Sequence, residues 1–294
     1  MFEKIQHSTI SRLDSISAEQ FLKEYKTPSK PVVLTELSSD WPARKKWSFD
    51  YLSKVAGDCE VPVYSSNKAT GKQHQHAAER VIALRDYLEL LKGGESDLRM
   101  FFYEIFKHAP KLLNDFEYPS IGLKLFKRLP VLFMGGRGAK VQMHYDIDLA
   151  DLLLCHFGGK KHVLLVPPEQ TKYLYKVPYS FSALFDVDLT KPDFDRFPAL
   201  QNVQAQITEL QHGDVLYIPS GYWHYIIYEE AGFSMTLRAL PRDFKTRMTL
   251  LKNIFITRSI ERLMRKLIGQ KWNDRNERRA IEITNKNLIT QTHD

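Results

Sequence analysis

Residues 140–168 read KVQMHYDIDLADLLLCHFGGKKHVLLVPP, and this stretch decides the fold. Its short apolar segments are separated by polar residues and by Gly158-Gly159, and Pro167-Pro168 closes the last one. Similar segments, such as GDVLYIPSGYWHYIIYE at residues 213–229, continue from about residue 130 to 240. Short apolar strands separated by glycine and proline are typical of a β-sandwich or β-barrel. The sequence therefore predicts a mainly β core with flanking helices.

The segments on either side of this core follow other patterns. Residues 1–125 mix helical and strand patterns, and we expect an α/β part packed on a barrel formed by residues 126–241. Residues 242–294 are expected to be basic C-terminal helices. The expected helices are 17–25, 47–57, 83–94, 244–269 and 273–286, the expected flanking strands are 31–37, 59–66 and 98–106, and the insert at 192–203 is expected to be irregular.

Composition narrows the class of protein. The 294 residues are 43% hydrophobic and 26% charged, as in ordinary globular proteins. The apolar runs are too short to span a bilayer, and the polar start MFEKIQHSTISRLDSI lacks the apolar centre of a signal peptide. Two cysteines, Cys59 and Cys155, are too few for a disulfide framework and favour free thiols. We therefore expect a cytoplasmic protein without a membrane-bound part.

The positive charge is concentrated near the C-terminus. Residues 242–282 hold twelve Lys or Arg and five Asp or Glu, which accounts for the whole net charge of +7. Such a segment can bind RNA, although it is more often the solvated face of a surface helix. Amphipathic helices after a barrel also form dimer interfaces, and we expect a homodimer through these helices.

His144 and Asp146 stand two residues apart at the start of a core segment. Residues i and i+2 of a strand point to the same side, so both side chains can reach one metal ion. An iron site of the oxygenase type uses two imidazoles and one carboxylate and leaves other positions open. His224, 80 residues later and just past a turn, is the best third ligand. The pattern predicts a metal centre of His144, Asp146 and His224.

The remaining histidines fit a metal site less well. His156 and His162 lie in apolar strands and are interpreted as core or rim residues, whereas His74 and His76 form a His-x-His pair on a polar loop. Lys161 begins the strand after the His-x-Asp strand. If it points inward, it can bind the far carboxylate of a dicarboxylic acid that chelates the metal. A lysine at the start of a strand is otherwise usually solvated.

Several motifs together resemble one known family. They are HYD, GGKKHVLLVPPEQTKYLY, KPDFDRFPALQNV and GDVLYIPSGYWHYI, with KPVVLTELSSDWPARKKWSFDYLSKVAGDCEVPV upstream. The chain resembles the cupin-like branch of the Jumonji-C oxygenases, which includes protein asparaginyl hydroxylases and tRNA wybutosine hydroxylases, over roughly residues 15 to 240. The resemblance implies a double-stranded β-helix, or jelly-roll, that binds Fe(II) and 2-oxoglutarate. It implies His144, Asp146 and His224 as metal ligands, and Lys161, or Lys160 in a shifted register, as the partner of 2-oxoglutarate.

Four positions depart from the family pattern around the co-substrate. Val141 stands where a threonine is common, Asp151 or Leu152 where an asparagine is common, and Arg238 where another asparagine is common. The co-substrate tyrosine corresponds to Phe101, or to Tyr103 in another register. Arg238 can bind a carboxylate itself or be a rim residue.

The resemblance implies an Fe(II)- and 2-oxoglutarate-dependent dioxygenase. Hydroxylation of a protein side chain is the leading expectation, with Tyr145 and Trp223 lining the substrate site. The alternatives are an RNA or tRNA hydroxylase, a demethylase of the same family, or a non-catalytic metal-binding cupin.

Overall fold

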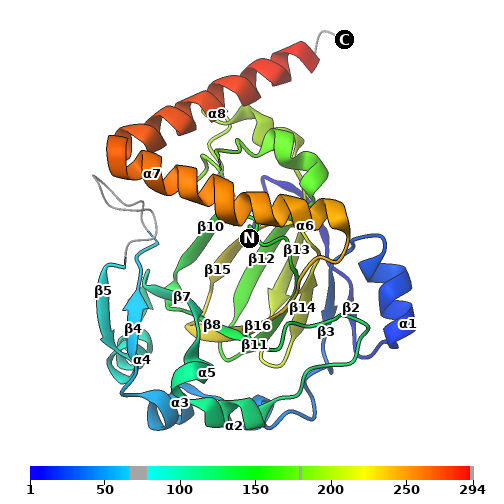
Figure 1. The fold of residues 1–294 in the computed structure, drawn as a ribbon, viewed down its shortest axis with the longest axis vertical. Coiled ribbons are helices and arrows are strands. Elements are labelled where there is room, and N and C mark those ends of the chain that lie inside the picture. The colour runs from blue at the N-terminus through cyan, green and yellow to red at the C-terminus, as the bar shows by residue number, and fades with distance from the viewer. Residues whose placement is uncertain (67–77, 179–180, 292–294) are drawn as a thin grey trace.

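Two facing sheets form the centre of the protein, as the computed structural model of residues 1–66, 78–178 and 181–291 shows (Figure 1). The five-stranded sheet runs in the order β1 (Gln6–Thr9), β13 (Gln204–Leu210), β12 (Lys161–Val166), β15 (Trp223–Tyr228) and β10 (Lys140–His144). The seven-stranded sheet runs in the order β2 (Arg12–Leu13), β3 (Val32–Leu34), β14 (Val215–Ile218), β11 (Asp151–Phe157), β16 (Gly232–Ala239), β8 (Val131–Gly135) and β7 (Arg99–Tyr103). The predicted mainly β jelly-roll is confirmed.

Strand β11 explains why the decisive stretch reads as an unbroken apolar run. Leu152 and Leu154 pack inside the barrel with residues of the five-stranded sheet. The alternate residues Leu153, Cys155 and Phe157 pack outside the barrel against the N-terminal helices. Both faces of the strand are therefore buried, and the alternation of apolar and polar residues is absent.

The N-terminal part, residues 1–125, completes the sheets and covers one of them. Its strands β1, β2, β3 and β7 belong to the two main sheets, so residues 1–125 share hydrogen bonds with the core. Its helices are α1 (Ala18–Phe21), which continues as a π-helix at Leu22–Lys26, α2 (Pro42–Lys46), α3 (Phe49–Ala56), α4 (Leu84–Lys92) and α5 (Ile105–His108). Two small sheets pair β4 (Glu60–Val63) with β5 (Arg80–Ala83) and β6 (Glu95–Ser96) with β9 (Arg137–Gly138). The domain boundaries stay a prediction.

Local sequence signals account for several element ends. Ser17 caps α1 with a capping box, since its hydroxyl accepts from the Gln20 amide while the Gln20 side chain accepts from the Ser17 amide. Helix α3 ends at Gly57, as expected. The sequence patterns did not predict β1 or α2. The insert at 192–203 holds only a short 3₁₀-helix, Pro198–Asn202, and 3₁₀-helices also cover Pro110–Asp115 and Pro168–Tyr173.

The C-terminal helices lie at the end of the barrel opposite α2 and α3 (Figure 1). They are α6 (Phe244–Leu251), a π-helical segment (Lys252–Thr257), α7 (Arg258–Ile268) and α8 (Gln270–Gln291), which is longer than expected. Gly269, with a φ of 70°, separates α7 from α8. The Asn253 side chain donates to the carbonyl of Ile147, which ties this region to the loop after β10. Within the described residues, no helix combines the length and the apolar character needed to cross a bilayer.

Candidate metal centre

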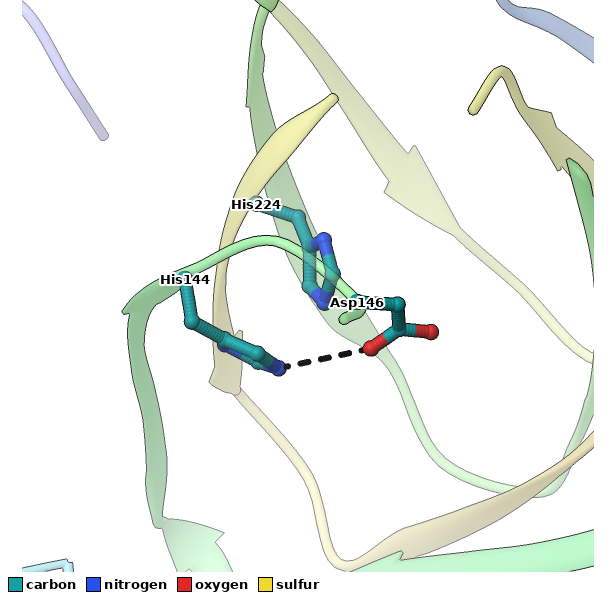
Figure 2. A group of neighbouring side chains, drawn as sticks. All are labelled: His144, Asp146 and His224. Carbon is teal, nitrogen blue, oxygen red and sulfur yellow. Dashed lines mark ion pairs between the residues drawn. The ribbon is translucent and has the colours of Figure 1, made fainter. Parts of the chain in front are cut away.

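His144, Asp146 and His224 converge at one point of the barrel (Figure 2). His144 is the last residue of β10 and lies directly across from His224 on β15, with ring centroids 4.1 Å apart. Asp146 follows in the turn after β10, and its Oδ1 lies 3.8 Å from His144 Nε2. One ligand atom from each residue lies within 4.8 Å of the others. The predicted three residues are therefore brought together, although Asp146 comes from a turn and not from the strand itself.

Hydrogen bonds to the backbone fix which nitrogen of each imidazole can bind a metal. His144 Nδ1 lies 2.8 Å from the carbonyl of Gln142, and His224 Nδ1 lies 3.3 Å from the carbonyl of Tyr222. A carbonyl only accepts, so each Nδ1 carries the proton and each Nε2 keeps its lone pair. Burial lowers the pKa of both imidazoles, to about 3 for His144, where the neighbouring His224 adds to the effect. Both rings are thus neutral and ready to coordinate a metal.

Arg238 holds the carboxylate ligand in its charged form. Its Nη1 lies 2.9 Å from Asp146 Oδ2 and 2.8 Å from Asp148 Oδ2. Burial favours the protonated acid, but the Arg238 charge, followed by the two histidines, holds the Asp146 pKa at about 2. Burial raises the pKa of Asp148. The structure therefore pairs Arg238 with Asp146, the candidate carboxylate ligand; the predicted binding of the co-substrate by Arg238 is not tested by these contacts.

We expect Arg238→Gln to weaken metal binding 10- to 100-fold, roughly the range found when a group that orients a metal ligand is lost. The substitution removes the cation that keeps Asp146 ionised and oriented. Anaerobic titration with Fe(II), or calorimetry with Mn(II), measures the change. The matched control is Arg137→Gln, since Arg137 is exposed on β9. Equal affinities for the two variants would contradict this role of Arg238.

Lys161 points into the barrel and not into solvent. Only 1% of the residue is exposed, and its Nζ lies 5.3 Å from the centroid of the Tyr228 ring. Burial lowers its pKa to about 7, and no carboxylate contributes to that shift. A buried ammonium without an anion is costly, so this lysine suits an incoming carboxylate. Lys160, the alternative, lies instead near Glu209, with 3.9 Å between Nζ and Oε1.

A hydrogen-bond chain holds Lys161 in place. His156 Nε2 lies 3.1 Å from the Gly159 carbonyl and therefore carries the proton. His156 Nδ1 then accepts from the Ser234 hydroxyl, 2.9 Å away, and the Ser234 oxygen accepts from Lys161 Nζ. Burial, aided by the Lys161 charge, lowers the pKa of His156 far below its usual value. His156, expected as a core or rim histidine, is a core residue that orients the lysine.

Orphaned donors around the centre fit an acid ligand. Arg99 Nε, Thr236 Oγ1 and Arg238 Nε are buried and have no hydrogen-bond partner among the described residues. Thr236 lies on β16 between Ser234 and Arg238, so all three side chains share one face of that strand. Buried donors of this kind are normally satisfied, and carboxylate oxygens would satisfy them. The residues present thus fit both a divalent metal, through two neutral imidazoles and one carboxylate, and an organic acid.

The other predicted site residues fall into two groups. Tyr145 and Trp223 lie beside the metal ligands and pack edge to face, with centroids 4.9 Å apart. Trp223 is fully buried and donates to Thr171 Oγ1, so only Tyr145 of the pair is partly exposed. Tyr103 donates to the Glu60 carbonyl and stacks on His108, away from the metal ligands.

The remaining positions raised by the sequence lie elsewhere or outside the described residues. His162 forms a short contact with Glu229 at the outer rim, with 2.6 Å between Nε2 and Oε2. His74 and His76 lie outside the described residues. Sequence reasoning missed Asp148, although the HYDID motif contains it, and Arg99, a single basic residue within an apolar strand.

A family profile described as a cupin-like domain matches residues 17–245. The chain belongs to the cupin-like family, within the Jumonji-C branch of oxygenases. It is 29% identical over 259 residues to the human tRNA wybutosine-synthesizing protein 5, covering 81% of this chain and 80% of the relative. It is 30% identical to the Drosophila melanogaster Jumonji C domain-containing protein 5 (77% and 59%) and 28% identical to the Xenopus tropicalis lysine-specific demethylase 8 (78% and 52%). The chain thus spans little more than half of the latter two relatives.

Proposed function

We propose that the protein is an Fe(II)- and 2-oxoglutarate-dependent dioxygenase. The observation that carries the proposal is the pairing of a two-histidine, one-aspartate centre with Lys161, a buried lysine that has no anionic partner in the described part of the chain. His144, Asp146 and His224 would hold Fe(II), and Lys161 would bind the distal carboxylate of 2-oxoglutarate. Iron so held, with the keto acid, supplies the oxidation of a substrate C–H bond by dioxygen. The chain's own part is to orient the acid and exclude water from the barrel.

The first test needs no substrate. Fe(II) and then 2-oxoglutarate are added to the protein without oxygen, and the visible spectrum is recorded for a metal-to-ligand charge-transfer band. We expect a band that is lost in His144→Ala and weakened in Lys161→Ala. Iron binding without any band would contradict the dioxygenase proposal and would favour the non-catalytic metal-binding cupin.

For the substrate, we propose hydroxylation of a protein side chain. The exposure of the site supports access by a macromolecule, because the side chains of His144 and Asp146 are each 21% exposed at the end of the barrel. Mass spectrometry of candidate peptides after turnover distinguishes hydroxylation, a gain of one oxygen, from demethylation, the loss of a methyl group. The two free thiols, Cys59 and Cys155, support a reducing compartment such as the cytoplasm.

RNA is the second candidate substrate. Two observations favour it: the basic C-terminal helices and the similarity to a relative named as a tRNA wybutosine-synthesizing protein. Binding of tRNA through these helices predicts an affinity that falls steeply with salt. Filter binding between low and physiological salt measures this dependence. A weak, salt-independent affinity would leave the protein substrate as the only one of the two proposals.

We also propose a homodimer formed through the C-terminal helices. Large apolar side chains of α6, the π-helical segment and α7 are strongly exposed. Exposed apolar surface that exceeds a few scattered residues marks an interface. The exposed fractions are 80% for Phe244, 67% for Phe255, 54% for Leu263 and 69% for Leu267. With these apolar residues at the centre of the contact, the basic residues would lie at its rim, where solvent and salt screen their mutual repulsion.

Leu263→Asp combined with Leu267→Asp is expected to convert the dimer to a monomer, since two carboxylates would be buried at the interface. Light scattering coupled to size-exclusion chromatography measures the mass. Lys271→Asp, on the exposed start of α8, is the control and should remain dimeric. A wild-type protein that is monomeric at micromolar concentration would overturn the dimer proposal.

A further inference from the structure

Arg99 is a buried cation that the proposed centre has not yet used. It lies on the edge strand β7, with only 5% of the residue exposed. One guanidinium nitrogen, Nη2, donates to Gln142 Oε1 at 2.7 Å, and the Nε has no partner among the described residues. No ion pair to Arg99 occurs within the described residues, and burial lowers its pKa to about 10. The protein thus buries a guanidinium without a carboxylate.

Arg99 differs in this respect from Arg238. Arg238 is equally buried, but two carboxylates, Asp146 and Asp148, neutralise it. The carboxylate that contributes to the Arg99 pKa is Asp97, and its effect is smaller than that of burial; Asp97 accepts hydrogen bonds from Ser66. A buried guanidinium is stable when an anion accepts its paired donors. Of these two arginines, Arg99 is therefore the one that can receive an anion from outside.

Gln142 connects Arg99 to the candidate metal centre. Gln142, its hydrogen-bond partner, also offers the backbone carbonyl that holds His144 Nδ1. The guanidinium carbon lies 5.4 Å from the centroid of the Phe101 ring, so a cation–π contact fixes the side chain from a second direction.

Tyr228 connects the two buried cations. Lys161 lies over its ring, and the Arg99 charge acts on its phenol. The strand register explains the approach: Arg99 pairs with Gly135, and a side chain at Gly135 would collide with the Tyr228 ring. Because residue 135 is glycine, the Tyr228 ring can lie against β8 at the position that pairs with Arg99 of β7.

We infer that Arg99 is a second cationic anchor for the distal carboxylate of the acid bound by Lys161, and that it determines the specificity of the pocket for dicarboxylic keto acids. The inference rests on the proposed dioxygenase function. The acid would lie with its keto end at His144, Asp146 and His224 and its far carboxylate between Lys161 and Arg99. Two cations around one carboxylate favour a charged distal group over an apolar one of the same size.

The experiment compares two keto acids that differ only at the far end. 2-Oxopentanoate carries a methyl group where 2-oxoglutarate carries its distal carboxylate. Both are titrated anaerobically into the Fe(II)-loaded full-length protein, followed by the charge-transfer band, and into the Mn(II)-loaded protein by calorimetry. The variants are Arg99→Gln, Arg99→Lys as the conservative change, and Arg137→Gln as the exposed control.

We expect Arg99→Gln to weaken 2-oxoglutarate binding by roughly 10- to 100-fold, the range for losing a hydrogen bond to a charged group. Binding of 2-oxopentanoate should change less than about threefold, Arg99→Lys should restore part of the loss, and Arg137→Gln should match the wild type. An equal loss for both acids, or no loss, would overturn the role of Arg99. If the wild type binds iron but neither keto acid, both the proposed function and the role of Arg99 are wrong. If the wild type and Arg99→Gln bind iron and 2-oxoglutarate equally well, only the role of Arg99 is wrong.

Discussion

Replacing Asp146 with alanine is expected to abolish turnover and to lower Fe(II) affinity by more than about 100-fold, beyond the effect of losing an orienting group. Asp146 is the only anion of the three ligands. Its loss also leaves two neutral imidazoles facing the Arg238 guanidinium, whose charge would then repel a divalent cation. Anaerobic Fe(II) titration and Mn(II) calorimetry give the affinity, and succinate formation gives the turnover.

The control for this variant is Asp186→Ala. Asp186 is also a carboxylate in an ion pair with an arginine, Arg196, but both side chains are exposed. Its removal should leave metal affinity unchanged. If Asp146→Ala bound Fe(II) as tightly as this control, the metal would be held by other residues and the assigned centre would be wrong.

Replacing Lys161 with methionine is expected to have two large effects of opposite sign. It should lower 2-oxoglutarate affinity by at least about 100-fold, because the buried carboxylate loses its primary cation. It should also stabilise the acid-free protein by an amount on the order of a few kcal/mol, because methionine fills a similar volume without a buried charge. The charge-transfer titration measures the first effect and urea unfolding measures the second.

The stabilisation should depend on pH in a defined direction. The Lys161 pKa is about 7 in the folded protein and 10.5 in the unfolded chain, so the unfolded chain binds more protons between these values. The free energy of unfolding of the wild type therefore increases as pH rises from about 7 to 10.5. Below pH 7 the folded protein carries the full cost of burying the charged lysine. The advantage of Lys161→Met should be greatest near pH 6 and shrink above pH 8. A constant difference would show that Lys161 is not buried as a charge.

Much of the barrel and the metal centre could be predicted from local sequence. The alternation of short apolar strands with glycine and proline depends on neighbouring residues, and the candidate metal ligands His144 and Asp146 are only two positions apart. His224 could be added because it follows a turn at the start of a strand. Such features depend on residues that are close in sequence, so they can be recognised without a three-dimensional structure.

The partners of the buried charges could not be predicted in the same way. Arg238 and Asp146 are 92 positions apart in the numbering, and Arg99 meets Gln142 from another sheet. Such contacts depend on strand order and register, which the pattern of a single strand does not contain. The burial of Lys161 has the same origin, since a lysine at a strand start usually reaches water and here the pairing with β15 encloses it.

Strand β10 is the last strand in the order of its sheet. Among the described residues, β15 is the strand that pairs with it, and on its other side His144 forms an isolated bridge to Phe181. A metal ion held by His144 and His224 would join these two strands at the point where they pair. It would stabilise the edge of the sheet against local unfolding. Metal binding would then change the local stability of the sheet as well as the chemistry of the site. In the metal-free protein, β10 would separate from β15 more readily. The amides of residues 140–144 would exchange with deuterium faster without metal than with it, and this difference would show whether the protein holds a metal ion.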